Sequence, residues 1–202
     1  MKKSLTIFSL WFFLWPFAQR LEAQNGDARE IFAQAYSLYS NRNPSQAKEL
    51  FQKTLDANYR LADYSLYYLA VIAFNESDLA QSRQYLSQLK QLYPQTVWLH
   101  AAALQRAKLD IAETKYSQAN ETLRQLLADK SVKREILDEA LYLRAQAWES
   151  QGDLNRAYSS YEELRGASPN SRWPGLARKE QNRLREKYPE QFALSTISAL
   201  SD

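Results

Sequence analysis

Side chains that carry out acid–base, metal or nucleophilic chemistry are few in this sequence. His100 is the only histidine and cysteine is absent, which argues against a His-based catalytic pair, a His/Cys metal site or a disulfide framework. The four glycines are too scattered for a phosphate-binding loop or a nucleophile elbow. Carboxylate pairs such as Asp138-Glu139 and Glu162-Glu163 lie on amphipathic segments, where such groups are usually solvated. We therefore expect no catalytic residue, no metal and no cofactor.

A recurring pair of small and large residues indicates how the chain is organised. The small residue returns at separations of 35, 37 and 38 positions, as Ala47, Ser82, Ala119 and Ala157. A large residue follows four positions after each of them, as Phe51, Leu86, Leu123 and Tyr161. A period in this range is typical of stacked supersecondary units rather than of one globular core.

Each unit is predicted to consist of two helices joined by a short turn. The first helices, at 27–40, 61–74, 97–112 and 134–150, lack Gly and Pro and have apolar residues at three-to-four spacing. The second helices hold the small-large pair, at 43–55, 77–89, 114–127 and 152–164. Where the second helix crosses the first, a small side chain lets the two backbones approach, and the large side chain fills the gap beside the crossing.

This pattern resembles the tetratricopeptide repeat. That family pairs a small residue at position 8 with Ala at 20 and a large residue at 24, and position 8 here holds Ala35, Ala70, Ala107 and Ala145. The fourth unit matches best, with Gly152 at its turn and Pro169 at its end. The resemblance implies an all-α fold: a right-handed superhelical stack of about four TPR-like helix-turn-helix repeats plus a C-terminal capping helix at about 173–187.

The N-terminus is predicted to be a secretory signal peptide, residues 1–23. The basic start MKK precedes the apolar run LTIFSLWFFLWPFA, which is short for a membrane span of about 20 residues. We expect cleavage after Ala23, with an uncleaved anchor as the alternative. Export of a cysteine-free helical chain favours the bacterial periplasm, and no stable membrane span remains after cleavage. The repeat domain then covers 24–190, and 191–202 form a flexible tail.

Charge argues against nucleic acid as a partner. The formal net charge of +3 comes mainly from the predicted signal peptide, which contains Lys2, Lys3 and Arg20 against Glu22. Without that segment the chain is nearly neutral, so its basic balance is not a nucleic-acid signature.

The tetratricopeptide resemblance also implies a binding groove. In that family, positions 2, 5, 9, 12 and 13 of the first helix line the concave face. The residues carried over are mostly aromatic, with some polar groups: Phe32, Tyr36, Tyr39, Tyr64, Tyr67, Phe74, Asn75, Lys108, Tyr142 and Gln146. Tyrosine offers apolar area and a hydroxyl, which suits peptide backbones or sugar rings. The alternative is that several of these rings pack against the neighbouring repeat.

Two functions are consistent with this organisation. The first is a non-enzymatic periplasmic adaptor that holds a peptide or partner protein of the cell envelope in the groove. YPQT and SPNSRWPGLARKEQNRLREKYP resemble repeat ends of the outer-membrane assembly lipoprotein and of the periplasmic coordinator of the Tol–Pal system, although no lipobox Cys is present.

The second is the non-catalytic helical part of a lytic-transglycosylase-like system acting on peptidoglycan. LADYSLYYLAVIAF followed by QLYPQT resembles the helical region of those enzymes, but the Glu-Ser pairs here, at 76–77 and 149–150, lack the Gly-Leu-Met-Gln run of their catalytic domain. A cytosolic scaffold with a misinterpreted N-terminus is a third, weaker hypothesis.

Overall fold

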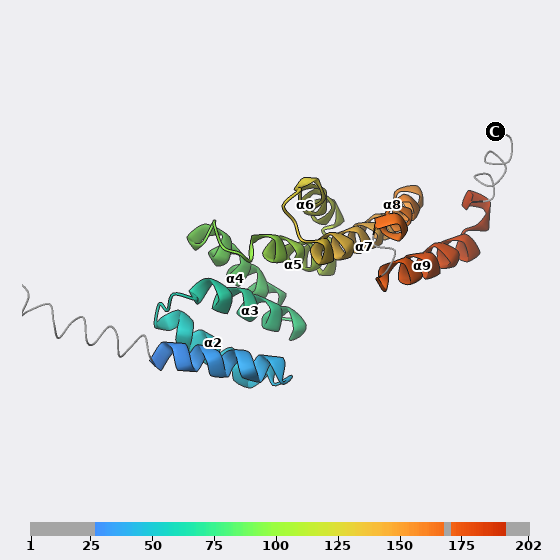
Figure 1. The fold of residues 1–202 in the computed structure, drawn as a ribbon. Helices are drawn as coiled ribbons and strands as arrows, with labels where there is room; N and C mark the ends of the chain where they lie inside the picture. Colours follow the sequence, from blue (N-terminus) through green and yellow to red (C-terminus); the bar gives the residue numbers. More distant parts are fainter. Residues whose placement is uncertain (1–26, 168–170, 193–202) are drawn as a thin grey trace, which may run out of the picture. The chain divides into compact units, whose positions relative to one another are not determined.

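The structure, a computed structural model, describes residues 27–167 and 171–192 of the 202-residue chain. Every regular element within these ranges is a helix (Figure 1), and the predicted all-α class is confirmed. In chain order the helices are residues 27–40, α2 (Pro44–Asp56), α3 (Ala62–Asn75), α4 (Leu79–Leu92), α5 (Leu99–Ala112), α6 (Tyr116–Ala128), α7 (Arg134–Ser150), α8 (Leu154–Ala167), α9 (Trp173–Lys187) and residues 189–192.

The two predicted end segments lie largely outside the described residues. The expected signal peptide, 1–23, is not described, and neither is 193–202 of the expected tail. The first two tail residues, 191 and 192, are helical, and the Phe192 side chain is only 8% exposed. The folded part therefore extends to Phe192. None of the described helices is long and apolar enough to cross a membrane.

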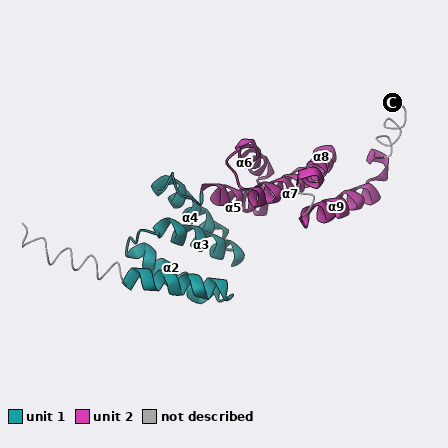
Figure 2. Ribbon diagram, in the orientation of Figure 1, with its two compact units in different colours: residues 1–98 teal, residues 99–202 magenta. Residues whose placement is uncertain are grey.

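The chain divides into two compact units, residues 1–98 (unit 1) and residues 99–202 (unit 2), which are coloured separately in Figure 2. Unit 1 contains the helix at 27–40 and α2 to α4, with α2 packed on α3 and α3 on α4. Unit 2 contains α5 to α9, and each of these helices packs on the next. Each unit therefore builds its core between helices that follow one another in the chain.

The close helix crossings predicted from the small residues are confirmed. The position-8 residues and their small partners in the second helices are all 0% exposed: Ala35, Ala70, Ala107, Ala145, Ala47, Ser82, Ala119 and Ala157. The large residues beside them are at most 5% exposed: Phe51, Leu86, Leu123 and Tyr161. Small side chains thus lie at each crossing, and large ones fill the space next to it.

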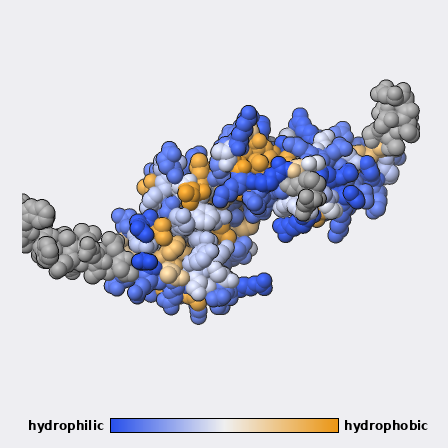
Figure 3. Space-filling view, viewed as in Figure 1, coloured by the Kyte–Doolittle hydropathy of each residue, from blue (hydrophilic) through white to orange (hydrophobic). Residues whose placement is uncertain are grey.

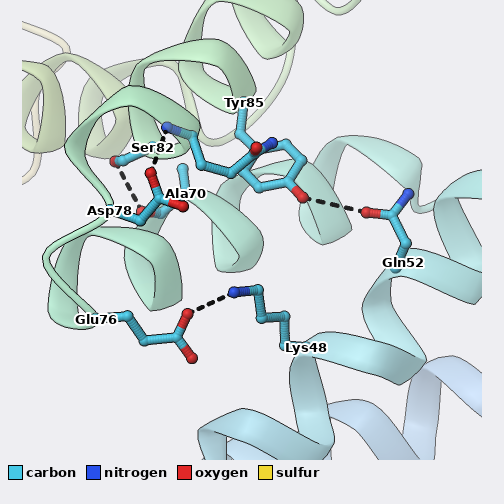
Figure 4. A network of polar contacts seen from close by, with 8 residues as sticks. Lys48, Gln52, Ala70, Glu76, Asp78, Ser82 and Tyr85 are labelled. Atoms are coloured by element: carbon cyan, nitrogen blue, oxygen red, sulfur yellow. Dashed lines mark hydrogen bonds and ion pairs between the residues drawn. The ribbon is translucent and has the colours of Figure 1, made fainter.

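Ser82 shows how close one crossing is. Its Oγ donates a hydrogen bond of 2.8 Å to the carbonyl oxygen of Ala70 on the facing helix (Figure 4). This bond satisfies a hydroxyl that is otherwise shielded from water. Farther out, Tyr85 of α4 donates to Gln52 of α2 at 3.2 Å, and Lys48 of α2 pairs with Glu76, the residue that follows α3 (Figure 4). Polar contacts therefore join α4 to α2 as well as to α3.

The turn inside each helical hairpin has one repeated backbone geometry. A residue with positive φ lies two positions after the end of each first helix: Arg42 (62°), Ser77 (64°), Thr114 (59°) and Gly152 (83°). The following residue donates its N–H to the carbonyl five positions earlier, as in the 2.7 Å bond from Lys115 to Asp110. This is the Schellman arrangement, in which a left-handed residue allows the last helical carbonyls to be paired.

One helix boundary predicted from the sequence is wrong. The segment 97–112 was expected to be helical throughout, but α5 begins at Leu99, and Val97 and Trp98 lie in the preceding turn. Thr96 fixes this turn, because its Oγ1 accepts the N–H of Trp98 at 3.2 Å and donates to Asp63 Oδ2 at 2.7 Å. The side-chain bond between Thr96 and α3 outweighs the helical pattern at these two residues.

The expected capping helix is α9. Its Ala177 and Leu184 are 0% exposed, and it packs on α8. Two polar residues of α9 contact the preceding helices: Gln181 is 1% exposed and donates to the carbonyl of Tyr158 at 3.3 Å, while the partly exposed Arg183 pairs with Glu149 of α7 through a 2.9 Å bond from Nη1. Polar contacts therefore help to hold the last helix against the array.

Replacing Ala157 by Leu tests the crossing. The added atoms have no free space between α7 and α8, so we expect the free energy of unfolding to fall by about 1–3 kcal/mol, the range for overpacking a core. Ala128→Leu is the control, because Ala128 is exposed at the end of α6. Chemical denaturation followed by circular dichroism measures both variants; equal stability of the Ala157 variant and the parent would contradict the crossing.

Exchanges at two equivalent turns should have opposite effects. Thr114→Gly relieves a left-handed conformation that costs a residue with a Cβ about 1–2 kcal/mol, and after the entropy lost to glycine we expect a net stabilisation of about 0.5–1 kcal/mol. Gly152→Ala should destabilise by about 1 kcal/mol. A Cβ at Gly152 meets no atom within 4 Å, so backbone strain alone accounts for that loss. Thermal unfolding that moves in the same direction for both variants would refute this account.

Candidate functional site

Five aromatic residues of unit 1 gather on neighbouring elements and form what we call the tyrosine face: Tyr36, Tyr39, Tyr67, Tyr68 and Trp98. The ring of Tyr68 lies at the centre, with centroid distances of 4.9 Å to Tyr39, 5.6 Å to Tyr67 and 5.7 Å to Tyr36. The Trp98 ring is stacked on Tyr67 at 4.2 Å with an interplanar angle of 14°. The helix at 27–40, α3 and the turn before α5 together position these rings.

Exposure differs sharply among these rings. Tyr36 is 49% exposed, while Tyr68 is only 9% exposed, and Tyr39, Tyr67 and Trp98 are half-buried. Much of the molecular surface is hydrophilic (Figure 3), and Tyr36 is one of four large apolar side chains that are exposed among the described residues, with Leu92, Val97 and Leu99. Tyr36 therefore presents an aromatic surface supported from below by packed rings.

Two other predicted groove residues of unit 1, Phe32 and Tyr64, are half-buried and pack against neighbouring rings. Phe32 contacts the rings of Phe51, Tyr59 and Tyr64 at centroid distances of 5.8, 6.2 and 6.1 Å. Tyr64 in turn lies edge-on to Trp98 at 5.1 Å. These rings pack between helices, which is the alternative that the sequence left open. The two predicted residues at the end of α3, Phe74 and Asn75, are half-buried and exposed respectively.

The three predicted groove residues of unit 2 have separate environments. Lys108 forms an ion pair of 2.7 Å with Glu139 across α5 and α7. Tyr142 packs on Tyr161 at 5.9 Å and on Trp173 at 5.5 Å, so its ring lies among α7, α8 and α9. Gln146 is half-buried on α7. Within unit 2 these side chains form no counterpart of the tyrosine face in the described part of the chain.

His100, Asp129 and Ser131 are the residue types of a catalytic triad, but their hydrogen bonds connect them in a different order. Its Nε2 is 3.1 Å from Asp129 Oδ2, and Ser131 Oγ donates to Asp129 Oδ1 at 2.7 Å. The carboxylate thus lies between the serine and the histidine, whereas a nucleophilic triad needs the imidazole in the middle. Hydrogen bonds from Ser131 lower the pKa of Asp129, which keeps this loop carboxylate ionised. Among residues 27–167 and 171–192, no group of three His, Asp or Glu side chains is arranged to hold a metal ion.

Comparison with known proteins identifies the repeat. A sequence profile described as Tetratricopeptide repeat matches residues 32–96 and 104–172, which is more than half of the chain. The chain belongs to the tetratricopeptide-repeat family. Among curated proteins none matches it in sequence.

Solved structures share the fold of this tetratricopeptide-repeat protein at low sequence identity. A double mutant of MamA from strain RS-1 superposes with a TM-score of 0.65 at 13% identity, covering 85% of this chain and 90% of that one. MamA residues 41 to the end from Desulfovibrio magneticus RS-1 gives 0.61 at 12% identity, with coverages of 84% and 96%. The TPR-like repeats of a putative kinesin light chain from Podosopora anserina give 0.62 at 17% identity, with coverages of 89% and 93%. At these identities the likeness establishes the fold.

Two residues of the tyrosine face were missed from the sequence of this tetratricopeptide-repeat protein. Tyr68 was not carried over from the family positions, and Trp98 was assigned to a helix. Three tyrosines cluster within four residues of each other at 64, 67 and 68, which is a signal for an aromatic patch. Trp98 had a weaker signal, the turn-forming Pro94 and Thr96 just before it.

Burial of the tyrosine face should make stability fall at alkaline pH. Burial is the main cause that raises the pKa of Tyr68 well above its ordinary value of 10.0. The unfolded chain therefore loses this proton near pH 10 while the folded chain keeps it, so the stabilisation is complete below about pH 10 and is lost as pH rises further. We expect Tyr68→Phe to lose about 1 kcal/mol less per pH unit than the parent between pH 10 and pH 11.

Urea unfolding at pH 8, 10 and 11 measures this difference. Tyr93→Phe serves as the control, because Tyr93 belongs to unit 1 but lies at the end of α4, outside the tyrosine face. An equal fall in the free energy of unfolding at alkaline pH for the Tyr68 variant, the control and the parent would show that Tyr68 is not shielded from solvent.

Proposed function

We propose that this tetratricopeptide-repeat protein is a non-catalytic interaction scaffold of the periplasm, and that its tyrosine face holds a peptide or a partner protein. The observation that carries the proposal is the half-exposed Tyr36 ring, which packs on the buried Tyr68 ring that Tyr39 and Tyr67 also contact. An exposed ring that is held in place by packed neighbours can act as a binding anchor, because its conformation is already fixed in the free protein.

The chemistry of the rings favours a polypeptide as the ligand. Tyrosine combines a large apolar area with a hydroxyl and has few rotatable bonds, so it binds at a low cost in conformational entropy. The hydroxyls suit the carbonyl and amide groups of a peptide backbone, and the rings suit its apolar side chains. Membership of a repeat family whose fold presents extended binding surfaces supports the same view.

Export is part of the proposal and rests on the sequence. The basic start, the short apolar run and Ala23 before Gln24 are the three parts of a secretory signal peptide. Cleavage there would release a chain that begins at Gln24 into the cell envelope, where the partner would reside. An uncleaved signal would instead tether the same repeats to the membrane.

A photo-crosslinking amino acid at Tyr36 tests this function in the native cells. We expect a discrete protein adduct from position 36 and none from Gln84, an exposed residue on α4 of the same unit. The same purified sample should begin at Gln24 by N-terminal sequencing. With the partner in hand, Tyr36→Ser should weaken binding by roughly tenfold or more, as for an aromatic hot spot.

Leu92→Ser is the matched control for affinity, because Leu92 is an exposed apolar residue of unit 1, 60% exposed, outside the tyrosine face. It should leave binding unchanged. Adducts that form equally at positions 36 and 84 would contradict the proposal. Adducts with glycan strands, together with sedimentation on purified peptidoglycan that Tyr36→Ser abolishes, would replace the protein partner by the peptidoglycan alternative.

A further inference from the structure

A second candidate site lies in unit 2 and has a different chemistry. Helices α6, α7 and α8 line an open surface pocket of about 420 Å³, within the range of small-ligand sites. Arg144 and Trp148 of α7 line it between residues of α6 and α8. No residue of the tyrosine face contributes to it, so this site is independent of the function proposed above.

Three arginines line the pocket, and only one of them is mostly buried. Arg124 is 65% exposed and is held by Glu121 through bonds of 2.8 and 2.6 Å. Arg156 is 64% exposed and lies 4.6 Å from the centroid of the Trp148 ring. The side chain of Arg144 is 20% exposed. The two exposed arginines thus lie at the rim, and Arg144 is the cation inside.

Arg144 is incompletely paired within its own chain. Its Nη2 donates to Glu163 Oε2, but its buried Nε has no hydrogen-bond partner. Glu163 is 57% exposed, so its side chain is free to rotate into water. A carboxylate that accepts from both Nε and Nη2 makes the stronger, bidentate pair with arginine. Glu163 therefore accepts only one of the two hydrogen bonds that a bidentate carboxylate would accept from Arg144.

Asn120 supplies a second unmet group in the same pocket. It is 6% exposed, and its Nδ2 donates to Gln151 Oε1 at 2.9 Å, whereas its Oδ1 has no donor. A ligand that satisfies both residues must bring acceptor oxygens for Arg144 and a hydrogen-bond donor for Asn120. Sulfate at neutral pH has no donor, but a peptide carries an N–H beside every acidic residue.

We propose that this pocket binds a carboxylate of an acidic peptide, which displaces Glu163 from Arg144. The incoming carboxylate accepts from Nε and Nη2 of Arg144, and a peptide N–H next to it donates to Asn120 Oδ1. Glu163 moves into solvent, where its charge is hydrated. Arg124 and Arg156 at the rim attract the acidic segment, so binding weakens as salt is raised.

Titration of the purified protein with defined peptides, followed by NMR, tests this proposal. The probe is acetyl-Ala-Glu-Ala-Glu, and the matched neutral probe is acetyl-Ala-Gln-Ala-Gln-amide. We expect the Trp148 indole N–H and the Asn120 side-chain amide to shift and saturate with the acidic peptide alone. The Trp173 indole of α9, which does not line this pocket, serves as the reference in the same spectra and should not move.

Two variants should change the affinity in opposite directions. Arg144→Gln should weaken binding by roughly tenfold or more, the loss for a charge-assisted hydrogen bond. Glu163→Gln removes the competing carboxylate and should strengthen binding by up to roughly fivefold, the factor for a partly exposed ion pair. Glu162→Gln is the matched control, because it makes the same charge change on the adjacent residue, outside this pocket.

Other outcomes would overturn the proposal. Equal NMR shifts with the neutral peptide would exclude carboxylate recognition. Equal gains in affinity from Glu162→Gln and Glu163→Gln would show that the effect comes from net charge alone. Saturation by sodium acetate with the affinity of the peptide would exclude the contact of Asn120 with a peptide N–H. The amidated peptide acetyl-Ala-Glu-Ala-Glu-amide separates the two sources of carboxylate: retained binding assigns the site to acidic side chains, and lost binding assigns it to a chain terminus.

Discussion

The close crossing of two helices in each hairpin is the constraint on which the rest of the structure depends. Alanine and serine bury little apolar area themselves, so their direct contribution to stability is small. Their effect is geometric: the backbones come near enough for Ser82 to reach the carbonyl of Ala70 at 2.8 Å. At that separation the large residues of both helices, such as Phe51 and Tyr161, become fully shielded. Each of these large side chains then contributes about 1.5–3 kcal/mol of hydrophobic stabilisation.

This constraint is also why much of the fold could be predicted from the sequence. A crossing needs a small residue at fixed positions of both helices. Small residues therefore recur at a regular spacing along the sequence, even though the other residues differ between units. The predicted helix 61–74 is observed at Ala62–Asn75, and the predicted capping helix is observed at Trp173–Lys187. The turn Thr96–Trp98 departed from the predicted helix, because the bonds of the Thr96 side chain to Asp63 and to the Trp98 N–H have no periodic pattern in the sequence.

The candidate sites could be predicted only in part, for a related physical reason. Tyr36, Tyr39 and Tyr67 were selected because family positions place them on one side of the first helices, but the same rule also selected Phe32, whose half-buried ring packs on Phe51, Tyr59 and Tyr64. Spacing along a helix gives the direction of a side chain and not the identity of what it meets. The pocket around Arg144 depends on unmet hydrogen bonds among three helices, a property that no single segment of sequence contains.

The hairpin turn explains how one repeat can carry such different surfaces. The residue three positions after each buried alanine of the first helix differs in every unit, as Leu38, Ala73, Asp110 and Trp148. In every unit its carbonyl accepts the N–H of the residue after the left-handed turn, at 2.9, 2.9, 2.7 and 3.0 Å respectively. Because this bond uses only backbone atoms, the turn places no demand on the side chain. The position is therefore free to be a buried alanine in one hairpin and, in another, the indole that lines the arginine pocket.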